Sequence, residues 1–409
     1  MFDPENLEKT VEFSPYVLHY SARDKRVGVG GGVHGIRHEK LVKTYIDTLK
    51  KTSKILERAG WTKRDNSVHV YVCDLVTWVN SSYPFSFPQR PIGEEDEKTR
   101  LIGLRSRFDV ASMERVIELA SVEAAHEAIH IANWEYHNSY DEPNWHWLDE
   151  ATCVLLETEI VEFSQDNLKY ALEWVDRPDV PLDGTVGYQQ YPFLKYLCGR
   201  KGKSLASQVS SLWTSQIQAE TNNPFAAIQR FLGHEPFVSM ERNCFFENYC
   251  RDSYFLKENF PDIALRFASR MVAESFELSE VQPEVKSEPY RLPRLSCMYF
   301  RFYLAPTFGG KIQFEIVFSN TSKEPSTFVG SDHENRIKGT ACSAYLDGSR
   351  AESTGVDLAL TLDESNCRLS GMVNVENSET IDHFVLVVTN VEALSSASSS
   401  EFFVTAKLG

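Results

Sequence analysis

The spacing of apolar residues changes along the chain, and each change predicts a different kind of element. Three stretches near the N-terminus are rich in β-branched and aromatic residues and bounded by turn residues, which predicts strands. They are 14–21, 67–75 and 99–108. Residues 38–60 instead place apolar side chains along one face of a helix that would stop at Gly60. We expect a sheet with a long helix packed on it, in an N-terminal α/β subdomain over 1–110.

Beyond this subdomain, residues 111–280 show the periodicity of helices over most of their length. The predicted helical segments are 112–137, 149–164, 186–199, 203–218, 223–232, 236–251 and 261–277. This succession of segments predicts a helical subdomain.

Prolines and charged residues then mark a linker over 281–294. From 295 to 409 the pattern changes to short stretches in which apolar and polar residues alternate, such as KIQFEIVFSN and CRLSGMVNV. Turn residues separate these stretches. About seven such strands predict an antiparallel β-sandwich. The expected fold class is therefore α+β, with a C-terminal β-sandwich after the N-terminal and helical subdomains.

The composition is that of a folded chain and argues against some classes of partner. The 409 residues exceed the size at which a single hydrophobic core usually stops growing, so two or three domains are expected. Apolar residues make up 42% of the chain, which is ample for real cores. The formal net charge of −16 argues against nucleic acid or an anionic membrane surface as a partner.

The sequence shows no sign of a membrane span or of secretion. No apolar run approaches the roughly 18 residues that a span needs. The first residues, MFDPENLEKTVEF, lack the basic start, apolar core and cleavage site of a signal peptide. We expect a cytoplasmic protein, or a secreted one if a leader has been removed.

The eight cysteines are scattered without any C-x-x-C pair. Their density is too low for a disulfide scaffold, so most are expected to be buried thiols. This spacing also argues against a zinc site built on cysteine.

A metal site is predicted elsewhere, by the H-E-x-x-H motif that His126, Glu127 and His130 form. The surrounding stretch is rich in alanine and glutamate and has no glycine or proline, which favours a helix. Residues four apart share a helix face, so both imidazoles can point at one ion with Glu127 beside it. A catalytic zinc ion also needs a third protein ligand and an open fourth position.

Four downstream residues are candidates for the third ligand, and Glu150 fits best. His137 lies about two turns beyond His130, and the glycine that would turn the chain back toward the metal is missing. His146 is expected in a loop with a hydrogen-bonding or surface role, and Asp149 is expected to be the N-cap of a second helix. Glu150 would begin that helix, where its carboxylate can face both histidines. Two histidines and one glutamate form a known catalytic zinc set.

H-E-x-x-H, nineteen residues and then Glu within W-L-D-E-A resembles the gluzincin zinc metallopeptidases. The pattern is closer still to a group of largely uncharacterised bacterial metalloproteases, most of them secreted. The matching stretches are VEAAHEAIH (122–130), WLDEATCVLLE (147–157), YQQYPFLKYL (188–197) and FVLVVTN (384–390). Two features depart from these patterns: a secretion signal is missing, and Ala151 replaces the glycine usual in the aminopeptidase branch. The G-x-M-E-N exopeptidase signal is also missing, so aminopeptidase activity is not implied.

The resemblance implies roles for further residues. Glu127 would take a proton from the attacking water and pass it to the leaving amine. A tyrosine or histidine of the helical subdomain would stabilise the oxyanion. Tyr188 is the best match for this role, with Tyr191 and His234 as rivals. In gluzincins an edge strand pairs with the extended peptide substrate, which points here to 101–107.

Metal-bound imidazoles usually donate their second N–H group to a carboxylate or carbonyl. Three carboxylates lie close enough in sequence for this role: Glu123, Asp149 and Glu157. The sequence thus predicts a zinc-dependent metallopeptidase, most simply an endopeptidase acting on a peptide or protein substrate. The rivals are a zinc hydrolase with a non-peptide substrate and a non-catalytic binding protein on the same scaffold.

Overall fold

The computed structural model describes most of the chain in segments separated by gaps. The described residues are 7–22, 26–27, 32–33, 39–61, 67–73, 87–89, 100–106, 108, 110, 112–133, 136, 143–161, 166–184, 187–200, 204–219, 223–239, 244–255, 272–305, 308–318, 337–347, 350–363, 368–375, 380–391 and 401–409. The chain divides into two compact units, and each unit draws on two segments. The first unit contains Met1–Asn167 and Leu197–Ala227, and the second contains Leu168–Tyr196 and Ile228–Gly409. Helices and several sheets together make the fold α+β, as predicted.

A five-stranded sheet with the order β1-β2-β5-β7-β6 forms the N-terminal part of the first unit. Its strands are β1 (Lys9–Phe13), β2 (Tyr16–Tyr20), β5 (Val68–Cys73), β6 (Phe87–Gln89) and β7 (Arg100–Arg105). The three central strands β2, β5 and β7 run parallel, whereas β1 and β6 pair antiparallel at the two edges. The three strands predicted for this region are confirmed as β2, β5 and β7. A small hairpin of β3 (Arg26–Val27) and β4 (Gly32–Val33) is also present.

The prediction that 101–107 is an edge strand is wrong. β7 pairs with β5 on one side and with β6 on the other, so β6 is the edge. Phe87–Gln89 lies in a charged, proline-rich stretch with no alternating pattern, so no strand was predicted there. Pro88 suits this position. Proline has no N–H group to donate, and it is tolerated at a sheet edge because no further strand needs that hydrogen bond.

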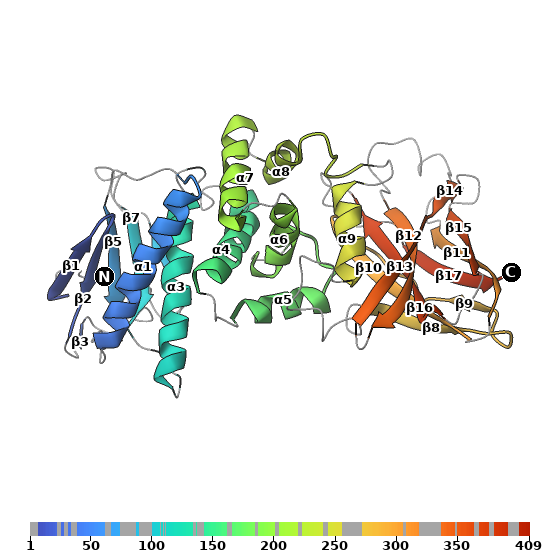
Figure 1. Cartoon of the computed structure of the whole chain (residues 1–409), viewed down its shortest axis with the longest axis horizontal. Helices are drawn as coiled ribbons and strands as arrows, with labels where there is room; N and C mark the ends of the chain where they lie inside the picture. The colour runs from blue at the N-terminus through green and yellow to red at the C-terminus, as the bar shows by residue number, and fades with distance from the viewer. Residues whose placement is uncertain are drawn as a thin grey trace. The chain divides into compact units, whose positions relative to one another are not determined.

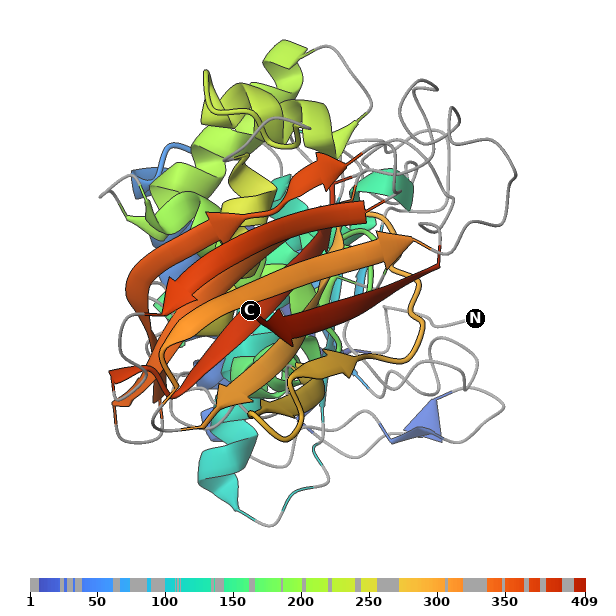
Figure 2. The same ribbon diagram turned by 90° about the vertical axis from the view of Figure 1, so that its right-hand side faces the viewer.

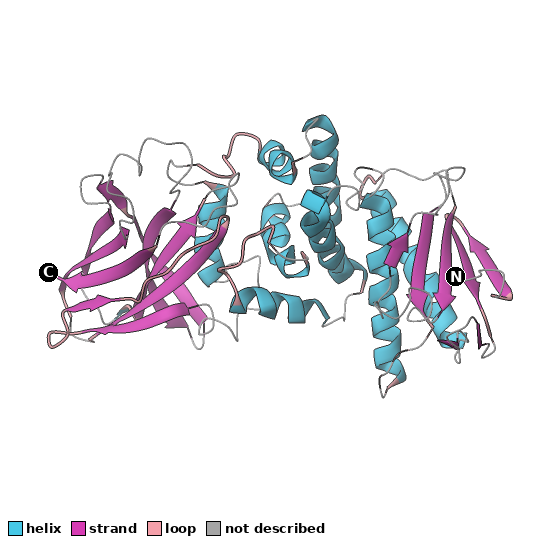
Figure 3. Ribbon diagram, turned by 180° about the vertical axis from the view of Figure 1, so that it is seen from behind, coloured by secondary structure: helices cyan, strands magenta, loops and turns pink. Residues whose placement is uncertain are grey.

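Two helices, α1 (Glu39–Arg58) and α3 (Met113–Asn133), cover one face of this sheet (Figures 1 and 3). Alternate strand residues, such as Val70 and Leu104, are fully buried beneath them. The face that α3 turns toward this core carries Ala120, Ala124 and Ala128, and these small side chains let the helix approach closely. The sheet and α1 therefore fix the position of α3, which carries the H-E-x-x-H motif.

The predicted end of the first helix at Gly60 is confirmed. Gly60 has a φ of 92°, the left-handed conformation that glycine adopts without a Cβ penalty. Its N–H group donates to the carbonyl oxygen of Glu57 (3.2 Å), and the next N–H group, of Trp61, donates to that of Leu56 (3.0 Å). These two bonds form a Schellman motif, which satisfies carbonyl groups at the end of α1.

Helix α4 (His146–Ile160) follows a 3₁₀ turn at Pro143–Trp145 and lies beside α3. Almost every residue of α4 is buried, as expected for a helix that packs against neighbours on several sides. One neighbour is α7 (Leu205–Ala219), where the indole N–H group of Trp213 donates to the hydroxyl of Thr152 (3.2 Å). The packing holds α4 firmly against the motif helix. Among the described residues, none of the helices is both long and apolar enough to span a membrane.

The second unit contains two five-stranded sheets with the orders β13-β12-β16-β10-β8 and β14-β15-β11-β17-β9. Their strands are β8 (Val272–Leu278), β9 (Glu284–Lys286), β10 (Ser296–Leu304), β11 (Gly310–Phe318), β12 (Ile337–Asp347), β13 (Arg350–Ala359), β14 (Thr361–Asp363), β15 (Arg368–Val375), β16 (His383–Asn390) and β17 (Phe402–Leu408). All pairings are antiparallel except that of β8 with β10. Figure 2 faces the sheet that contains β17, the last strand.

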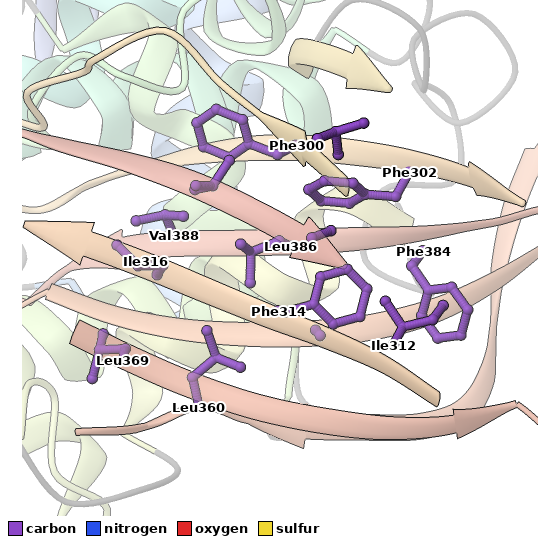
Figure 4. Packing of buried hydrophobic residues seen from close by; sticks show 14 of the residues in the cluster. Phe300, Phe302, Ile312, Phe314, Ile316, Leu360, Leu369, Phe384, Leu386 and Val388 are labelled. Atoms are coloured by element: carbon purple, nitrogen blue, oxygen red, sulfur yellow. The ribbon is translucent and has the colours of Figure 1, made fainter. Parts of the chain in front are cut away.

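One hydrophobic core receives side chains from both of these sheets (Figure 4). Phe300 and Phe302 come from β10 and Leu386 from β16, whereas Phe314 and Ile316 come from β11 of the other sheet. Helix α9 (Phe245–Phe255) contacts β10 and β16, and every residue of β16 is buried. The other elements of this unit are α5 (Asp166–Asp176), η3 (Tyr188–Gln190), α6 (Tyr191–Gly199) and α8 (Pro224–Leu232), of which α5, α6 and α8 cross unit boundaries.

Three sequence predictions in this part of the chain are wrong. Residues 272–278, predicted as the end of a helix, form β8, and their burial alternates as it does in a strand. The stretch predicted as a linker contains β9, which pairs with β17. Helix α5, with the sequence DNLKYALEWVD, was not among the predicted segments.

Candidate metal centre

Helices α3 and α4 face each other with one polar stripe each. The stripe on α3 contains His126, Glu127, His130 and Asn133, and the stripe on α4 contains His146, Asp149, Glu150, Cys153 and Glu157. Asn133 donates a hydrogen bond to Asp149 (2.7 Å) near one end, and His126 bonds Glu157 near the other. The helices are therefore antiparallel, and spacings of three and four residues keep each stripe on one face.

The two histidines and the predicted third ligand converge on one point. The Nε2 atoms of His126 and His130 lie 3.0 Å apart. Glu150 Oε2 lies 3.1 Å from Nε2 of His126 and 3.3 Å from Nε2 of His130. Donor atoms 2.0–2.1 Å from a zinc ion in tetrahedral geometry lie about 3.3 Å from one another. The three atoms thus already have nearly the spacing of one tetrahedral face.

The other nitrogen of each imidazole faces a carboxylate of α4. Nδ1 of His126 hydrogen-bonds Glu157 Oε1, and Nδ1 of His130 lies 2.9 Å from Asp149 Oδ2. Carboxylates at both positions favour the tautomers with the proton on Nδ1. The Nε2 lone pairs then point at each other and at an oxygen of Glu150. Three acceptors this close repel one another unless a cation or additional protons lie between them.

Electrostatics also draws positive charge to this point. Burial alone would lower the pKa of His126, but Glu157 and Glu150 outweigh it and raise the pKa to about 10. Burial likewise opposes protonation of His130, whose pKa Asp149 nonetheless raises well above its ordinary value. Burial would raise the pKa of Glu150, yet the two imidazoles hold it below its ordinary value. Carboxylates that hold protons on two buried imidazoles would also hold a divalent cation in their place.

Glu127 is a buried acid within this cluster. It is only 4% exposed, and its Oε2 atom has no hydrogen-bond partner among the described residues. Burial raises its pKa to about 7, although the charges of His126 and His130 lower it. A carboxylate with this pKa can accept and return a proton near neutral pH. The donor set, its supporting carboxylates and this buried acid fit a zinc ion with an adjacent general base.

Cys153 belongs to the same cluster, which the sequence analysis missed. One nitrogen of each histidine and the sulfur of Cys153 all lie within 4.8 Å of one another. The thiol is fully buried, and burial raises its pKa well above its ordinary value. Cys153 is not part of a C-x-x-C pair, so the cysteine pattern did not indicate it as a ligand. The available signal was its place three residues after Glu150, on the same helix face.

The structure corrects two predictions about the start of α4. His146 is the first residue of the helix rather than part of a loop, and its Nε2 atom lies 3.8 Å from Glu150 Oε1. Asp149 is not the N-cap; Trp145 holds that position without a side-chain capping bond. Asp149 is instead fully buried inside the first turn, next to His130. The sequence did not reveal this start, because neither tryptophan nor histidine is a typical N-cap residue.

Two of the three carboxylates predicted to orient the imidazoles do contact them, namely Asp149 and Glu157. Glu123 does not; one turn before His126, it forms an ion pair with Arg105 of β7. This pair lets the motif helix contact the sheet through charges as well as through its alanines.

The candidates for the oxyanion role belong to the second unit. Tyr188 lies in η3 with its ring 5.0 Å from that of Tyr170, and Tyr191 is buried at the start of α6. His234 is exposed after α8. The role of Tyr188 stays a prediction. His137, a rejected candidate for the metal, lies outside the described residues.

No protein-family model and no curated protein matches the chain. Solved structures with some similarity include a protein from Sulfurospirillum deleyianum, at 7% identity and a TM-score of 0.21, covering 30% of this chain and 98% of that one. A periplasmic inhibitor of g-type lysozyme from Aeromonas hydrophila has 7% identity and a TM-score of 0.18, with 34% and 100% covered. The surface-associated copper-binding protein CorA of Methylomicrobium album BG8 has 6% identity and a TM-score of 0.19, with 34% and 99% covered. Similarities this slight assign neither fold nor function.

Proposed function

We propose that this protein is a zinc-dependent metallopeptidase of gluzincin type, acting as an endopeptidase on peptide or protein substrates. One observation carries the proposal. Three donor atoms, from His126, His130 and Glu150, lie 3.0–3.3 Å apart beside the buried carboxylate of Glu127, whose Oε2 atom has no hydrogen-bond partner among the described residues. A purely structural metal site has no use for a base of this kind.

In this proposal His126, His130 and Glu150 hold the ion. Zinc would supply a Lewis acid that activates water near neutral pH and polarises a substrate carbonyl. Glu127 accepts the proton of the attacking water and returns it to the leaving amine, for which a pKa near 7 is well suited. Glu157 and Asp149 keep the imidazoles in one orientation and tautomer.

Tyr188 remains our candidate for the group that stabilises the oxyanion, on the strength of the sequence resemblance. The same resemblance supports the finer description of the fold, as a gluzincin-like catalytic unit followed by a C-terminal β-sandwich. The single core shared by the two sheets around Phe302 and Phe314 supports the sandwich.

The proposal is tested by zinc analysis and by hydrolysis of an unfolded protein mixture, for the wild type and for Glu127→Gln. The variant should retain zinc and lose activity by at least about 100-fold, because general-base catalysis contributes about 10² to 10⁴. Glu118→Gln on the same helix is the matched control, since Glu118 forms a partly exposed ion pair with Arg115.

The outcomes separate the proposal from its rivals. Activity that survives Glu127→Gln, or a chain that binds no metal, would contradict a catalytic zinc site and favour a binding protein. Bound zinc without hydrolysis of any peptide would favour a hydrolase with a non-peptide substrate.

A further inference from the structure

Helix α4 offers the histidine pair two different donors. Glu150 and Cys153 are three residues apart and share one helix face, so both side chains reach His126 and His130. The carboxylate is the nearer donor, at 3.1 and 3.3 Å from the two Nε2 atoms. The sulfur is the softer donor, within 4.8 Å of a nitrogen of each ring.

We propose that Cys153 is a further ligand of this centre, which lets it bind thiophilic ions such as Cd²⁺ through His126, His130 and the Cys153 thiolate. The proposal rests on the proposed metal centre but not on peptidase activity. Harder or borderline ions would use the oxygen of Glu150, whereas ions that prefer sulfur would use Cys153. Binding replaces the thiol proton with the metal ion, and the proton is released to solvent.

The geometry needs only a small adjustment. A thiolate about 2.3 Å from an ion and an imidazole nitrogen about 2.05 Å from it lie about 3.6 Å apart in tetrahedral geometry. From within 4.8 Å, the sulfur and the nitrogens would have to approach by at most about 1.2 Å. Cys153 is fully buried between packed helices, so water does not compete for the sulfur.

No other thiol among the described residues offers this arrangement. Among the described residues, His126, His130 and Cys153 form the one group that brings a cysteine and two histidines close enough to hold an ion. Cys198 in α6 is also buried and is not part of a disulfide, so it serves as a matched control for the loss of a buried thiol.

Titration of the reduced, metal-free full chain with Cd²⁺ alone tests the proposal, read out by the ultraviolet thiolate-to-metal charge-transfer band. The wild type should bind one ion per chain and develop the band. Cys198→Ser and Glu150→Gln should keep the band, and Cys153→Ser should lose it. The Cd²⁺ affinity of Cys153→Ser should fall at least about tenfold, as it does on losing even an outer-shell partner. Cys153→Ala provides a second substitution if the serine variant does not fold.

Cadmium-113 NMR of the wild type gives a test without any substitution, because a sulfur ligand moves the resonance strongly downfield. The proposal is overturned if the wild type binds no Cd²⁺, binds it without the band and without the shift, or if Cys153→Ser keeps the band. These results are independent of hydrolysis. A protein that cleaves no peptide can still show the band, and an active peptidase can lack it.

Discussion

At the residue scale, the proposed metal centre depends on carboxylates that would not touch the ion. Glu157 contacts Nδ1 of His126, and Asp149 lies beside Nδ1 of His130. Each fixes a tautomer and leaves Nε2 free for a metal. The sequence predicted these partners and the two histidines, because spacings of three, four and seven residues on a helix determine which side chains share a face.

Replacing Glu157 with glutamine should weaken zinc binding by about 10- to 100-fold. The amide keeps an acceptor oxygen but loses the negative charge that supports the His126 imidazole. Competition with a chromogenic chelator measures the affinity, with Glu118→Gln as the control. An unchanged affinity would mean that Glu157 does not support the metal ligand.

Two residues at this scale differ from the prediction, and each difference has a physical reason. Cys153 contributes through its place on α4, and composition alone classified it as an ordinary buried thiol. Glu123 lies as close in sequence to His126 as a supporting carboxylate should, but Arg105 of β7 holds it instead. A partner from a distant strand cannot be inferred from helical spacing.

At the element scale, the ends of helices decide where the functional residues lie. Gly60 ends α1 through a left-handed conformation, a signal that the sequence carries plainly. The start of α4 carries no such signal, because burial of Trp145 and Trp147 replaces capping. Packing with α7 and α3 therefore determines this boundary, and packing is not visible in local sequence.

Gly60→Ala should lower the free energy of unfolding by roughly 1 kcal/mol, because alanine is strained at a φ of 92°. Space is not the cause, since the nearest atom to an added Cβ would be Ser210 Oγ at 3.7 Å. Denaturant unfolding followed by tryptophan fluorescence measures the effect. Lys43→Ala on the exposed face of α1 is the control and should change stability by less than about 0.5 kcal/mol.

Helix α9 is held to β16 by a buried polar chain. Tyr254 hydrogen-bonds Nε2 of His383 (2.7 Å), and Asp382 accepts from Nδ1 (2.7 Å). Arg301 donates to the Tyr254 hydroxyl (3.0 Å) and to that of Tyr303 (3.1 Å). Burial lowers the pKa of His383 below its ordinary 6.5, aided by Arg301 and opposed by Asp382.

This arrangement predicts acid sensitivity of the second unit. The folded state binds fewer protons at His383 than the unfolded state does, so its stabilisation is complete above pH 6.5 and is lost as the pH falls through the lowered pKa. Thermal unfolding by circular dichroism between about pH 8 and about pH 5 should show this decline. His383→Gln should flatten it, and His234→Gln, at an exposed histidine, should not. A decline unchanged by His383→Gln would exclude this residue as its source.

At the scale of the whole molecule, the candidate ligands all belong to the first unit. The sequence predicted contiguous subdomains, whereas each compact unit draws on two segments of the chain. The sequence shows only linkers and periodicity, and these predict subdomains that are each one continuous segment of the chain. The return of 197–227 to the first unit depends on packing of α7 against α4, a contact between residues far apart in sequence.

Metal binding should therefore stabilise the first unit specifically. Zinc at about 100 times its Kd adds about 2.7 kcal/mol to the stability of a folded state that alone binds it. Six of the seven tryptophans lie in the first unit, so fluorescence reports mainly on its unfolding. Its melting temperature should fall with a chelator and recover with zinc. His130→Ala should abolish both responses, and a wild type indifferent to zinc would contradict the metal centre.

The central claim is that one cluster both holds a catalytic metal and supplies its base, and the paired measurement of bound zinc and peptide hydrolysis in two variants tests it most directly. Glu127→Gln should keep about one zinc ion per chain and lose hydrolysis, because Glu127 moves protons without holding the ion. Glu150→Gln should lose hydrolysis and bind zinc more weakly, because it removes a donor. The account is contradicted if Glu150→Gln retains zinc and activity, or if Glu127→Gln still cleaves peptides.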